Sequence, residues 1–588
     1  MTAINNKVKK RMQMGADLEK KVGDGVIRRF NTSMTISVND IEFKAPKLRR
    51  QFKAVMIVAL MTLGTVGCSS KSKLQEGQVG YVGGFLGAVV ADEPRAALVG
   101  RQILSRGGSA ADAASAMYFM MSVTLPSRAG LGGGGVCLAF DAAKAKTEVL
   151  DFTAQAPAKI SPASDRPTAI PGNPRGFFAL QARYGRLMWR EIIGPAEHLA
   201  RFGFPASRTF ARDLQATGSA LLMDPSAREM FAGKSGVKVA QEGEPIDLPD
   251  LAATLGLLRA RGVGPMYTGP FAQNFTKTVN NAGGSLTTKE LRNFIPKWRA
   301  TVRVDVGFDV AHFAPPPAAA SSVAAVMTSV LEANGDYGGG DVGERATLLA
   351  ETQLRAFADR STWLNAVGSS TLNASAITSE ARIESIMQGM NSDHRSPLSS
   401  FEPKPYNYHE NPSATGFSAV DAGGNAVACA VTMNAAFGTG RVAKGTGILL
   451  ASAPSNTGRG AIGLAPMLLV NENAHEFKLA ATASGGVAAP SALMNVVAGT
   501  VFADENLRTA ISQPRVHLSG APDVTYHEPN LGPKALKALS KAGHRTQTTP
   551  EIGQVNALYC AKGLPSAPET CQMATDPRGS GLASGSMR

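Results

Sequence analysis

Apolar and polar positions alternate in a way that predicts helices and strands from about residue 83 onward. Residues 91–107 and 110–121 carry apolar side chains at helical spacing, and Gly107-Gly108 separates the two segments. Shorter apolar runs at 136–141 and 147–152 follow, and their length favours strands. The chain is therefore expected to alternate between helices and strands over most of its length.

A β-hairpin is predicted around residues 413–434. Val, Ala, Phe and Cys recur at 413–421 and 428–434, and Asp421-Ala422-Gly423-Gly424-Asn425 between them is a turn signal. Because these strands hold few charges, we expect them to be buried on both faces. The preceding residues, 391–412, are polar and Pro-rich. Thr415 therefore stands at the mouth of a buried strand, where chain cleavage would expose it as a nucleophile with its own α-amine as base.

Composition narrows the class of protein. The 588 residues are 44% apolar and 18% charged with 62 Gly, which fits a globular protein with a large core. Only 6% are aromatic, which argues against a stacking platform for nucleic acid. Residues 1–53 hold 13 Lys/Arg against 5 Asp/Glu, more than half of the net charge of +14. The remainder shows no basic stripe, so nucleic acid is not an expected partner.

An export signal is predicted near the N-terminus. A basic cluster at 47–53 precedes an apolar run at 54–66, which ends at Gly67-Cys68. The run is too short to span a bilayer, so a signal peptide is favoured over a membrane helix. Gly67-Cys68 resembles a bacterial lipoprotein box, which makes Cys68 the expected lipidation site of a periplasmic, membrane-anchored protein. Plain secretion and an uncleaved anchor stay open, and Met34 is one alternative start.

Cysteine and histidine usage allows one disulfide and indicates no metal site. Cys560 and Cys571 lie close together in a Pro-containing tail, and a bridge there would contribute about 3 kcal/mol in the chain-entropy model. Cys137 and Cys429 fall in apolar strand patterns and are interpreted as buried small hydrophobic residues. No spacing of Cys, His, Asp and Glu indicates a metal site, and no cofactor is expected.

Four successive glycines, Gly132 to Gly135, precede the predicted strand at 136–141. A phosphate-binding loop would continue with Lys and Ser/Thr and a helix, neither of which is found here. A tight packing turn is therefore the favoured interpretation.

The order of motifs resembles the γ-glutamyltransferase family of N-terminal-nucleophile hydrolases. The similar segments are Gly107-Gly108-Ser109-Ala110-Ala111-Asp112-Ala113-Ala114, Gly130-Leu131-Gly132-Gly133-Gly134, Asp151-Phe152 with Ala156-Pro157, Tyr267-Thr268-Gly269, Pro315-Pro316-Pro317, the 355–360 helix and Asp576-Pro577-Arg578. The resemblance runs from about residue 85 to the C-terminus. It implies a four-layer αββα sandwich, made as one precursor and cut into large and small subunits. The expected parts are a leader (1–67), a linker (68–84), a large-subunit region (85–414) and a small-subunit region (415–588), the last two forming one αββα domain.

The resemblance weakens at the nucleophile. The family's small subunit opens with two Thr, and alignment through Phe417 places Ala414 at the nucleophile and Thr415 one residue later. A slip of one residue turns a strand side chain to the opposite face. Thr415 is therefore the predicted catalytic residue only if the register differs locally, with Gly416 absorbing the shift.

Other active-site positions are retained. Thr432 and Asn434 match the family's supporting Thr and its substrate-side Asn. Gly485-Gly486 matches the pair whose backbone N–H groups form the oxyanion hole. The oxyanion machinery is therefore expected to be present.

Glutamyl recognition, by contrast, is expected to be altered. Thr153 stands where the family has the Arg that binds the α-carboxylate, and a bidentate Arg contact is not replaced by Thr. Ala451 and Ser455 stand at the family's Asn and Asp, and Ile462-Gly463 at its Ser-Ser pair. The substrate is expected to be a small amide or peptide, γ-glutamyl or not, held differently from glutathione.

Two hypotheses follow from the sequence. The first is an exported enzyme for acyl transfer or amide hydrolysis that cuts itself before Thr415, its two fragments staying associated. The second is a lipid-anchored pseudoenzyme that keeps the fold for binding or scaffolding. The departure at Ala414 favours the second, and the retained Thr432 and Gly485-Gly486 favour the first.

Overall fold

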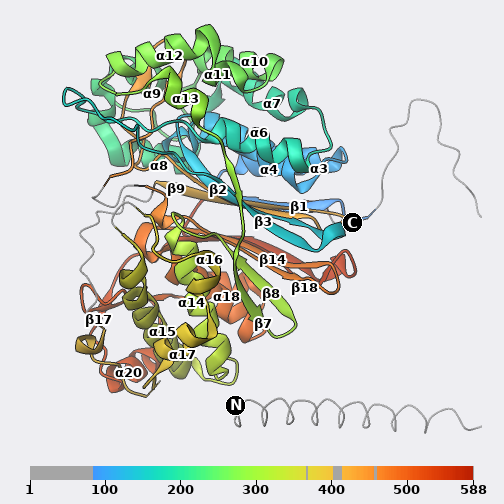
Figure 1. Ribbon diagram of the computed structural model, residues 1–588, viewed down its shortest axis with the longest axis vertical. Coiled ribbons are helices and arrows are strands. Elements are labelled where there is room, and N and C mark those ends of the chain that lie inside the picture. Colours follow the sequence, from blue (N-terminus) through green and yellow to red (C-terminus); the bar gives the residue numbers. More distant parts are fainter. Residues whose placement is uncertain (1–83, 366–367, 392, 402–412, 456–459, 587–588) are drawn as a thin grey trace, which may run out of the picture. The chain divides into compact units, whose positions relative to one another are not determined.

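Two stacked antiparallel β-sheets with helices on both outer faces make up the structure (Figure 1). The computed structural model describes residues 84–365, 368–391, 393–401, 413–455 and 460–586. These described residues cluster as one compact unit. The leader segment with Cys68 lies outside the described residues, and so does the polar stretch 402–412.

The first sheet has seven strands, and several neighbouring strands come from distant parts of the sequence. Their order is β20 (Leu582–Ser586), β1 (Gly87–Ala91), β9 (Ala414–Asp421), β10 (Ala426–Thr432), β2 (Gly134–Asp141), β3 (Lys146–Phe152) and β6 (Lys297–Arg299). The predicted hairpin is thus β9 and β10, and every residue of both strands is buried. It lies at the centre of the sheet, between the two N-terminal strands β1 and β2.

The second sheet has six strands. Their order is β19 (Cys571–Thr575), β18 (Gln554–Leu564), β14 (Glu476–Ser484), β13 (Ala465–Asn471), β8 (Asp309–Phe313) and β7 (Val302–Val306). Short strands outside the two sheets are β4 (Phe204–Pro205) with β5 (Pro245–Ile246), β11 (Val442–Ala443) with β12 (Ile448–Leu449), and β15 (Val516–His517), β16 (Thr525–His527) and β17 (Thr546–Thr548).

Helices cover the outer face of each sheet (Figure 1). Those on the side of the first sheet are α3 (Pro94–Ser105), α4 (Ala110–Thr124), α5 (Pro126–Ala129), α6 (Asn173–Tyr184), α7 (Trp189–Phe202), α8 (Arg208–Thr217), α9 (Pro225–Phe231), α10 (Pro249–Arg261), α11 (Gly264–Tyr267), α12 (Gly269–Asn281) and α13 (Thr288–Asn293). Those on the side of the second are α14 (Ala319–Asn334), α15 (Val342–Trp363), α16 (Ala374–Ile377), α17 (Glu380–Met387), α18 (Ala489–Val497), α19 (Leu507–Ser512) and α20 (Pro533–Lys541).

Three apolar cores separate these four layers. One lies between the first sheet and its helices and includes Phe417 and Val431. A second lies between the two sheets and includes Ala414, Val420 and Ala480. The third lies between the second sheet and its helices. The predicted αββα sandwich is therefore the observed fold, and alternate residues of β9 point into two different cores.

Local signals explain where the central elements begin and turn. Ser109 and Asp112 form a capping box at the start of α4, in which each side chain satisfies the other's backbone N–H. In the β9–β10 turn the Asp421 carboxylate accepts from the N–H groups of Gly423 and Asn425 at 3.0 and 3.1 Å. Both features depend only on residues close in sequence, which is why the pattern predicted them.

One sequence interpretation is wrong: Cys137 and Cys429 are not free buried thiols but form a disulfide. They are direct Cα partners on the adjacent strands β2 and β10, with Cα atoms 4.1 Å apart. Opposed residues of an antiparallel pair point to the same face, so their sulfur atoms meet. The separation of 292 residues hides this pairing in the sequence. Cys560 and Cys571, where a bridge was expected, are also joined, across β18 and β19.

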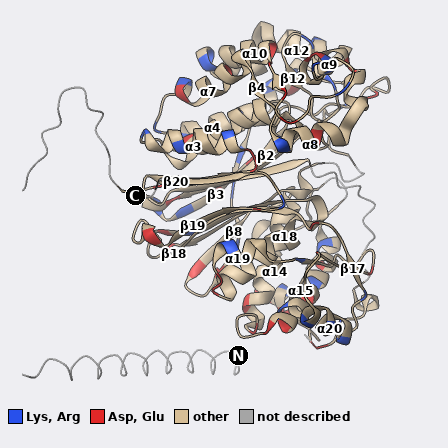
Figure 2. Cartoon of the chain, turned by 180° about the vertical axis from the view of Figure 1, so that it is seen from behind, with Lys and Arg blue, Asp and Glu red and all other residues tan. Residues whose placement is uncertain are grey.

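Charged side chains lie mainly on the helices and at strand ends, with both signs interspersed (Figure 2). Among the described residues, no helix combines the length and apolar character needed to cross a bilayer.

Candidate active site

The ends of β9 and β10 bring together the positions that resemble the family's nucleophile and its supporting Thr. Ala414 and Thr432 are direct Cα partners. Ala414 belongs to the core between the sheets, and opposed residues share a face. Thr432 therefore also points between the sheets, and it faces a methyl group rather than a hydroxyl at position 414.

The Thr432 hydroxyl has partners on either side of this pair. It accepts from the Asn434 N–H at 2.9 Å. It lies 3.2 Å from the Ser413 hydroxyl and 3.3 Å from the Ser413 carbonyl oxygen. All three residues are buried. We call Ser413, Thr432 and Asn434 the hydroxyl cluster.

Thr415 occupies a different environment. Its Cα partner is Val431, and Val431 and Phe417 both pack in the core that faces the helices. The pleat therefore turns Thr415 away from the side of Thr432. Its hydroxyl is fully buried and donates to the Asp92 carboxylate at 2.7 Å. Sequence analysis did not single out Asp92, because it lies 323 residues from Thr415.

Asp92 connects the two sheets. Its carboxylate accepts from the Asn556 side-chain amide at 2.7 Å, and the same amide donates to the Gly416 carbonyl at 3.0 Å. Because Asp92 follows β1 and Asn556 lies on β18, the Thr415 hydroxyl is one member of a buried network that spans both sheets. Such a network stabilises the fold when every donor is satisfied.

A buried arginine adds positive charge near this carboxylate. Arg128 in α5 donates to Asp213 through Nε at 2.8 Å and through Nη2 at 2.7 Å. Burial alone would lower the pKa of Arg128, but Asp213 first and then Asp92 favour the charged form and hold its pKa above the ordinary value. The Arg128 guanidinium is therefore held in its charged form, paired with Asp213.

Gly485-Gly486 follows β14 and lies toward the start of β9. A Cβ on Gly416 would come within 2.4 Å of the Thr482 hydroxyl, so these strands cross closely there. At the opposite end of β14, Phe477 pairs with Leu564 of β18. The Leu564 carbonyl oxygen lies against Gly424 in the β9–β10 turn. β14 therefore runs opposite to β9, and its final residues approach the hydroxyl cluster.

The positions of the family's Ser-Ser pair lie beside these glycines. A Cβ on Gly463 would stand 3.4 Å from the Gly486 Cα. Ile462 is buried in the core of the second sheet and its helices. Gly485 and Gly486 have φ of +131° and +64°, a backbone geometry that favours glycine. This end of the site presents backbone and apolar groups.

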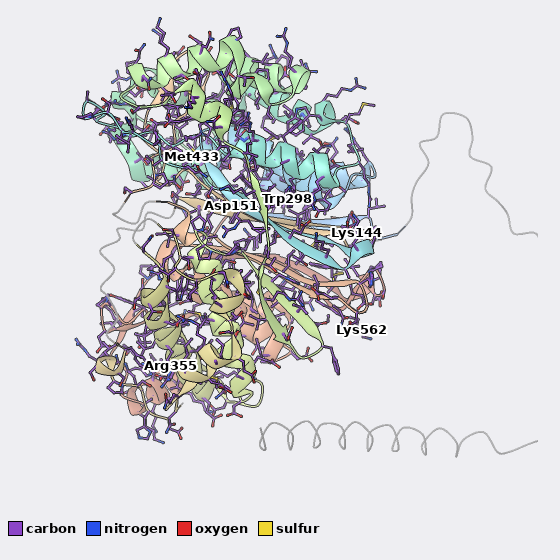
Figure 3. All side chains as sticks on the ribbon, viewed as in Figure 1. Lys144, Asp151, Trp298, Arg355, Met433 and Lys562 are labelled. Carbon is purple, nitrogen blue, oxygen red and sulfur yellow. A yellow bond between two sulfur atoms is a disulfide. The ribbon has the colours of Figure 1, made fainter. Side chains whose placement is uncertain are left out.

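The glycine-rich turn is a packing turn, as the sequence favoured. A Cβ on Gly133 would come within 2.4 Å of the Thr432 carbonyl oxygen, and one on Gly134 within 2.1 Å of the Ala154 nitrogen. The turn thus joins the end of β10 to the segment after β3. Figure 3 labels Met433, directly after β10, and Asp151, near the end of β3.

The position of the family's carboxylate-binding Arg is closed by local hydrogen bonds. The Thr153 hydroxyl donates to Asp151 at 2.8 Å. The same carboxylate accepts from Arg299 at 2.9 Å, and Arg299 also donates to the Pro316 carbonyl at 2.6 Å. β6 brings Arg299 to this place from 148 residues away, and no sequence signal pointed to it.

Of the remaining predicted positions, Ala451 directly precedes a residue that contacts the hydroxyl cluster. Ala451 is buried, and its carbonyl accepts from the Ala169 N–H at 2.9 Å. The next residue, Ser452, accepts at its carbonyl from the Asn434 side-chain amide at 2.9 Å. Ser455 is the last described residue before the gap at 456–459. No group of three or more His, Cys, Asp and Glu suited to a metal ion occurs in the described part of the chain.

Comparison with known proteins decides the family. A family model described as Gamma-glutamyltranspeptidase matches residues 96–586. The chain belongs to the gamma-glutamyltranspeptidase family. The match covers both helical layers and every strand of the two sheets except β1, and thus the residues of the candidate site except Asp92.

Two relatives and one solved structure are informative. The glutathione hydrolase proenzyme of Escherichia coli is 27% identical over 515 residues, covering 80% of this chain and 88% of the relative. The acylase ACY 1 proenzyme of Pseudomonas sp. is 28% identical over 524 residues, covering 81% and 90%. The crystal structure of cephalosporin acylase from Bacillus halodurans is similar with a TM-score of 0.72 at 21% identity, covering 87% of this chain and 98% of that one. At that identity the last likeness shows the fold alone.

In this member of the gamma-glutamyltranspeptidase family, Thr432 and Asn434 lie at the start of β9. Gly485-Gly486, at the end of β14, approaches the same place. The Thr415 hydroxyl lies elsewhere, against Asp92. Ser413, which sequence analysis passed over, is the hydroxyl residue that lies against Thr432. The sequence feature that could have pointed to Ser413 is that this hydroxyl residue directly precedes Ala414.

Proposed function

We propose that this protein is an exported amide hydrolase or acyltransferase of the gamma-glutamyltranspeptidase family with altered glutamyl recognition. It cuts itself at the start of β9 and uses a hydroxyl exposed there as nucleophile. The observation that carries the proposal is the hydroxyl cluster, in which Ser413 and Thr432 lie 3.2 Å apart beside the end of β14. A nucleophilic hydroxyl requires a polar partner at this distance.

The chemistry needs no cofactor. A hydroxyl attacks the preceding carbonyl carbon, the peptide becomes an ester, and water releases a new α-amine. That amine then serves as the base, while the N–H groups of Gly485 and Gly486 would stabilise the oxyanion. Either hydroxyl residue that flanks Ala414, Thr415 from the sequence or Ser413 from the structure, can be written into this scheme.

The substrate class follows from the altered pocket. Thr153 is engaged with Asp151, and Ile462-Gly463 offers no hydroxyl beside Gly486. A γ-glutamyl group carries both a carboxylate and an ammonium, each of which needs a fixed partner. The name of the Pseudomonas relative, acylase, gives a class that suits this site better: an amide whose acyl group lacks that zwitterionic head.

A catalytically inactive binding or scaffolding protein is the second candidate. The observation that favours it is the Ala414 methyl group facing Thr432, at the position that resembles the family's nucleophile. In that case the chain stays whole, and the fold serves only to present surfaces.

A denaturing gel run with reductant separates the two candidates. The purified mature protein, incubated for several days, is expected to migrate as two fragments cut near residue 414. One uncut chain after that incubation would instead support the inactive protein. A denatured and refolded sample serves as a control for contaminating protease, since proteolysis by another enzyme would not depend on refolding.

Export as a lipoprotein is part of the proposal. Two disulfides within the described residues support an oxidising compartment. Changing Cys68 to Ala should move the protein from the membrane fraction to the soluble periplasmic fraction, because the lipid anchor is lost. The double change Cys560→Ala with Cys571→Ala, which removes a distant bridge and leaves no unpaired cysteine from it, is the matched control. Equal membrane binding of the Cys68→Ala variant and the unmodified chain would contradict the anchor.

A further inference from the structure

We propose that Ser413, and not Thr415, is the nucleophile, and that the chain is cut between residues 412 and 413. This inference rests on the proposed function and names the residue that performs it. The nucleophile would thus stand one residue before the position at which the family resemblance places it.

The contacts of Thr432 support this assignment. Its hydroxyl accepts from the Asn434 N–H at 2.9 Å and donates to the Ser413 carbonyl oxygen. The Ser413 hydroxyl and carbonyl oxygen lie 3.2 and 3.3 Å away. Ser413 is 6% exposed, so this contact is shielded from competing water. Thr432 therefore holds both the backbone and the hydroxyl of Ser413 in place.

The backbone around Asn434 is built to hold this geometry. Asn434 has a φ of +60°, which is uncommon for a residue other than glycine. Its side-chain amide donates to the Ser452 carbonyl at 2.9 Å, which fixes the residue in that conformation. Backbone strain held in place by neighbours is frequent at functional sites. Here it directs the Asn434 N–H onto the Thr432 oxygen.

The alternative nucleophile is already engaged. The Thr415 hydroxyl gives its single hydrogen to Asp92, and Asp92 is also bound by Asn556. Freeing Thr415 would break a buried network and still leave its side chain on the face away from Thr432. Ser413 precedes β9, so it is not bound by the alternation of the strand and needs no shift of register.

The reaction balances without any further reactant than water. The Ser413 oxygen attacks the carbonyl carbon of residue 412 and passes its proton to the Ser413 nitrogen as the C–N bond breaks. The resulting ester is hydrolysed, which leaves a carboxylate on residue 412 and a free α-amine on Ser413. In turnover that amine takes the hydroxyl proton, the oxygen attacks a substrate amide, and the proton passes to the departing amine. Water then releases the acyl group.

The first experiment is N-terminal sequencing of the smaller fragment from the unmodified protein on a reducing gel. The expected sequence is Ser-Ala-Thr-Gly. A fragment that begins Thr-Gly-Phe-Ser or Ala-Thr-Gly-Phe would overturn the assignment to Ser413 but leave the proposed function standing. A chain that stays uncut overturns both, so the two failures are distinguishable. This measurement needs no variant and does not depend on how a variant folds.

Variants give the second test. Ser413→Ala should slow cleavage by at least about 1000-fold, because it removes the attacking oxygen. Ser413→Thr should still cut, since it restores a hydroxyl. Ser418→Ala is the matched control: Ser418 lies in β9, which begins directly after Ser413, and its buried hydroxyl has no hydrogen-bond partner among the described residues. Cleavage of Ser413→Ala at the rate of the unmodified protein would overturn the assignment.

Discussion

Against γ-glutamyl anilides, this protein is expected to show a kcat/KM at least about 100-fold below that of the Escherichia coli relative. The reason is the closed carboxylate position. Thr153 supplies one neutral hydroxyl, which already donates to Asp151, where the family resemblance calls for a guanidinium. Charge-assisted hydrogen bonds contribute roughly 1.5–3 kcal/mol each, so the loss of a bidentate contact alone accounts for about two orders of magnitude.

The control for this prediction is a substrate without the zwitterionic head. An anilide of a simple acyl group should be turned over at least as fast as the γ-glutamyl anilide, because position 153 lacks the guanidinium and the charged groups beside it, Asp151 and Arg299, already pair with each other at 2.9 Å. Thr153→Arg should raise γ-glutamyl turnover more than Thr153→Lys, since only arginine forms a bidentate contact. Turnover of the γ-glutamyl anilide by the unmodified protein at the rate of the relative would refute the altered pocket.

The Cys137–Cys429 disulfide is expected to keep the two fragments covalently joined after cleavage. A cut near residue 414 places Cys137 in one fragment and Cys429 in the other, while the bridge spans β2 and β10. Without reductant the cut protein should therefore run as one species, and with reductant as two. Two species in the absence of reductant would contradict the bridge.

Removing this bridge should also destabilise the uncut chain. The double change Cys137→Ala and Cys429→Ala should lower the free energy of unfolding by about 2–5 kcal/mol, because the bridge closes a long loop in the unfolded chain. Denaturant unfolding measures this loss. Cys560→Ala with Cys571→Ala is the matched control, since that bridge spans only 11 residues and both cysteines fall in the same fragment. This control variant should lose less free energy of unfolding, and its gel pattern should be the same as that of the unmodified protein.

Features governed by short-range physics were predictable from the sequence. The hairpin of β9 and β10 follows from two apolar runs and a turn whose Asp421 caps its own backbone. The start of α4 follows from Ser109 and Asp112, three residues apart. The αββα sandwich followed from the resemblance of many ordered motifs, and the packing role of Gly133 from the poor fit to a phosphate loop.

What depends on neighbours distant in sequence was decided only by the tertiary structure. Strand register alone places Cys137 opposite Cys429, across 292 residues. The contact of Thr415 with Asp92 joins two strand ends 323 residues apart, and no local pattern distinguishes it from a free hydroxyl. Ser413 contacts Thr432 because β10 ends at Thr432, beside the first residue of β9. The backbone hydrogen bonds between the two strands fix the positions of both hydroxyls. A sequence lists side chains in order, but the pleat and the pairing of strands determine which of them share a face.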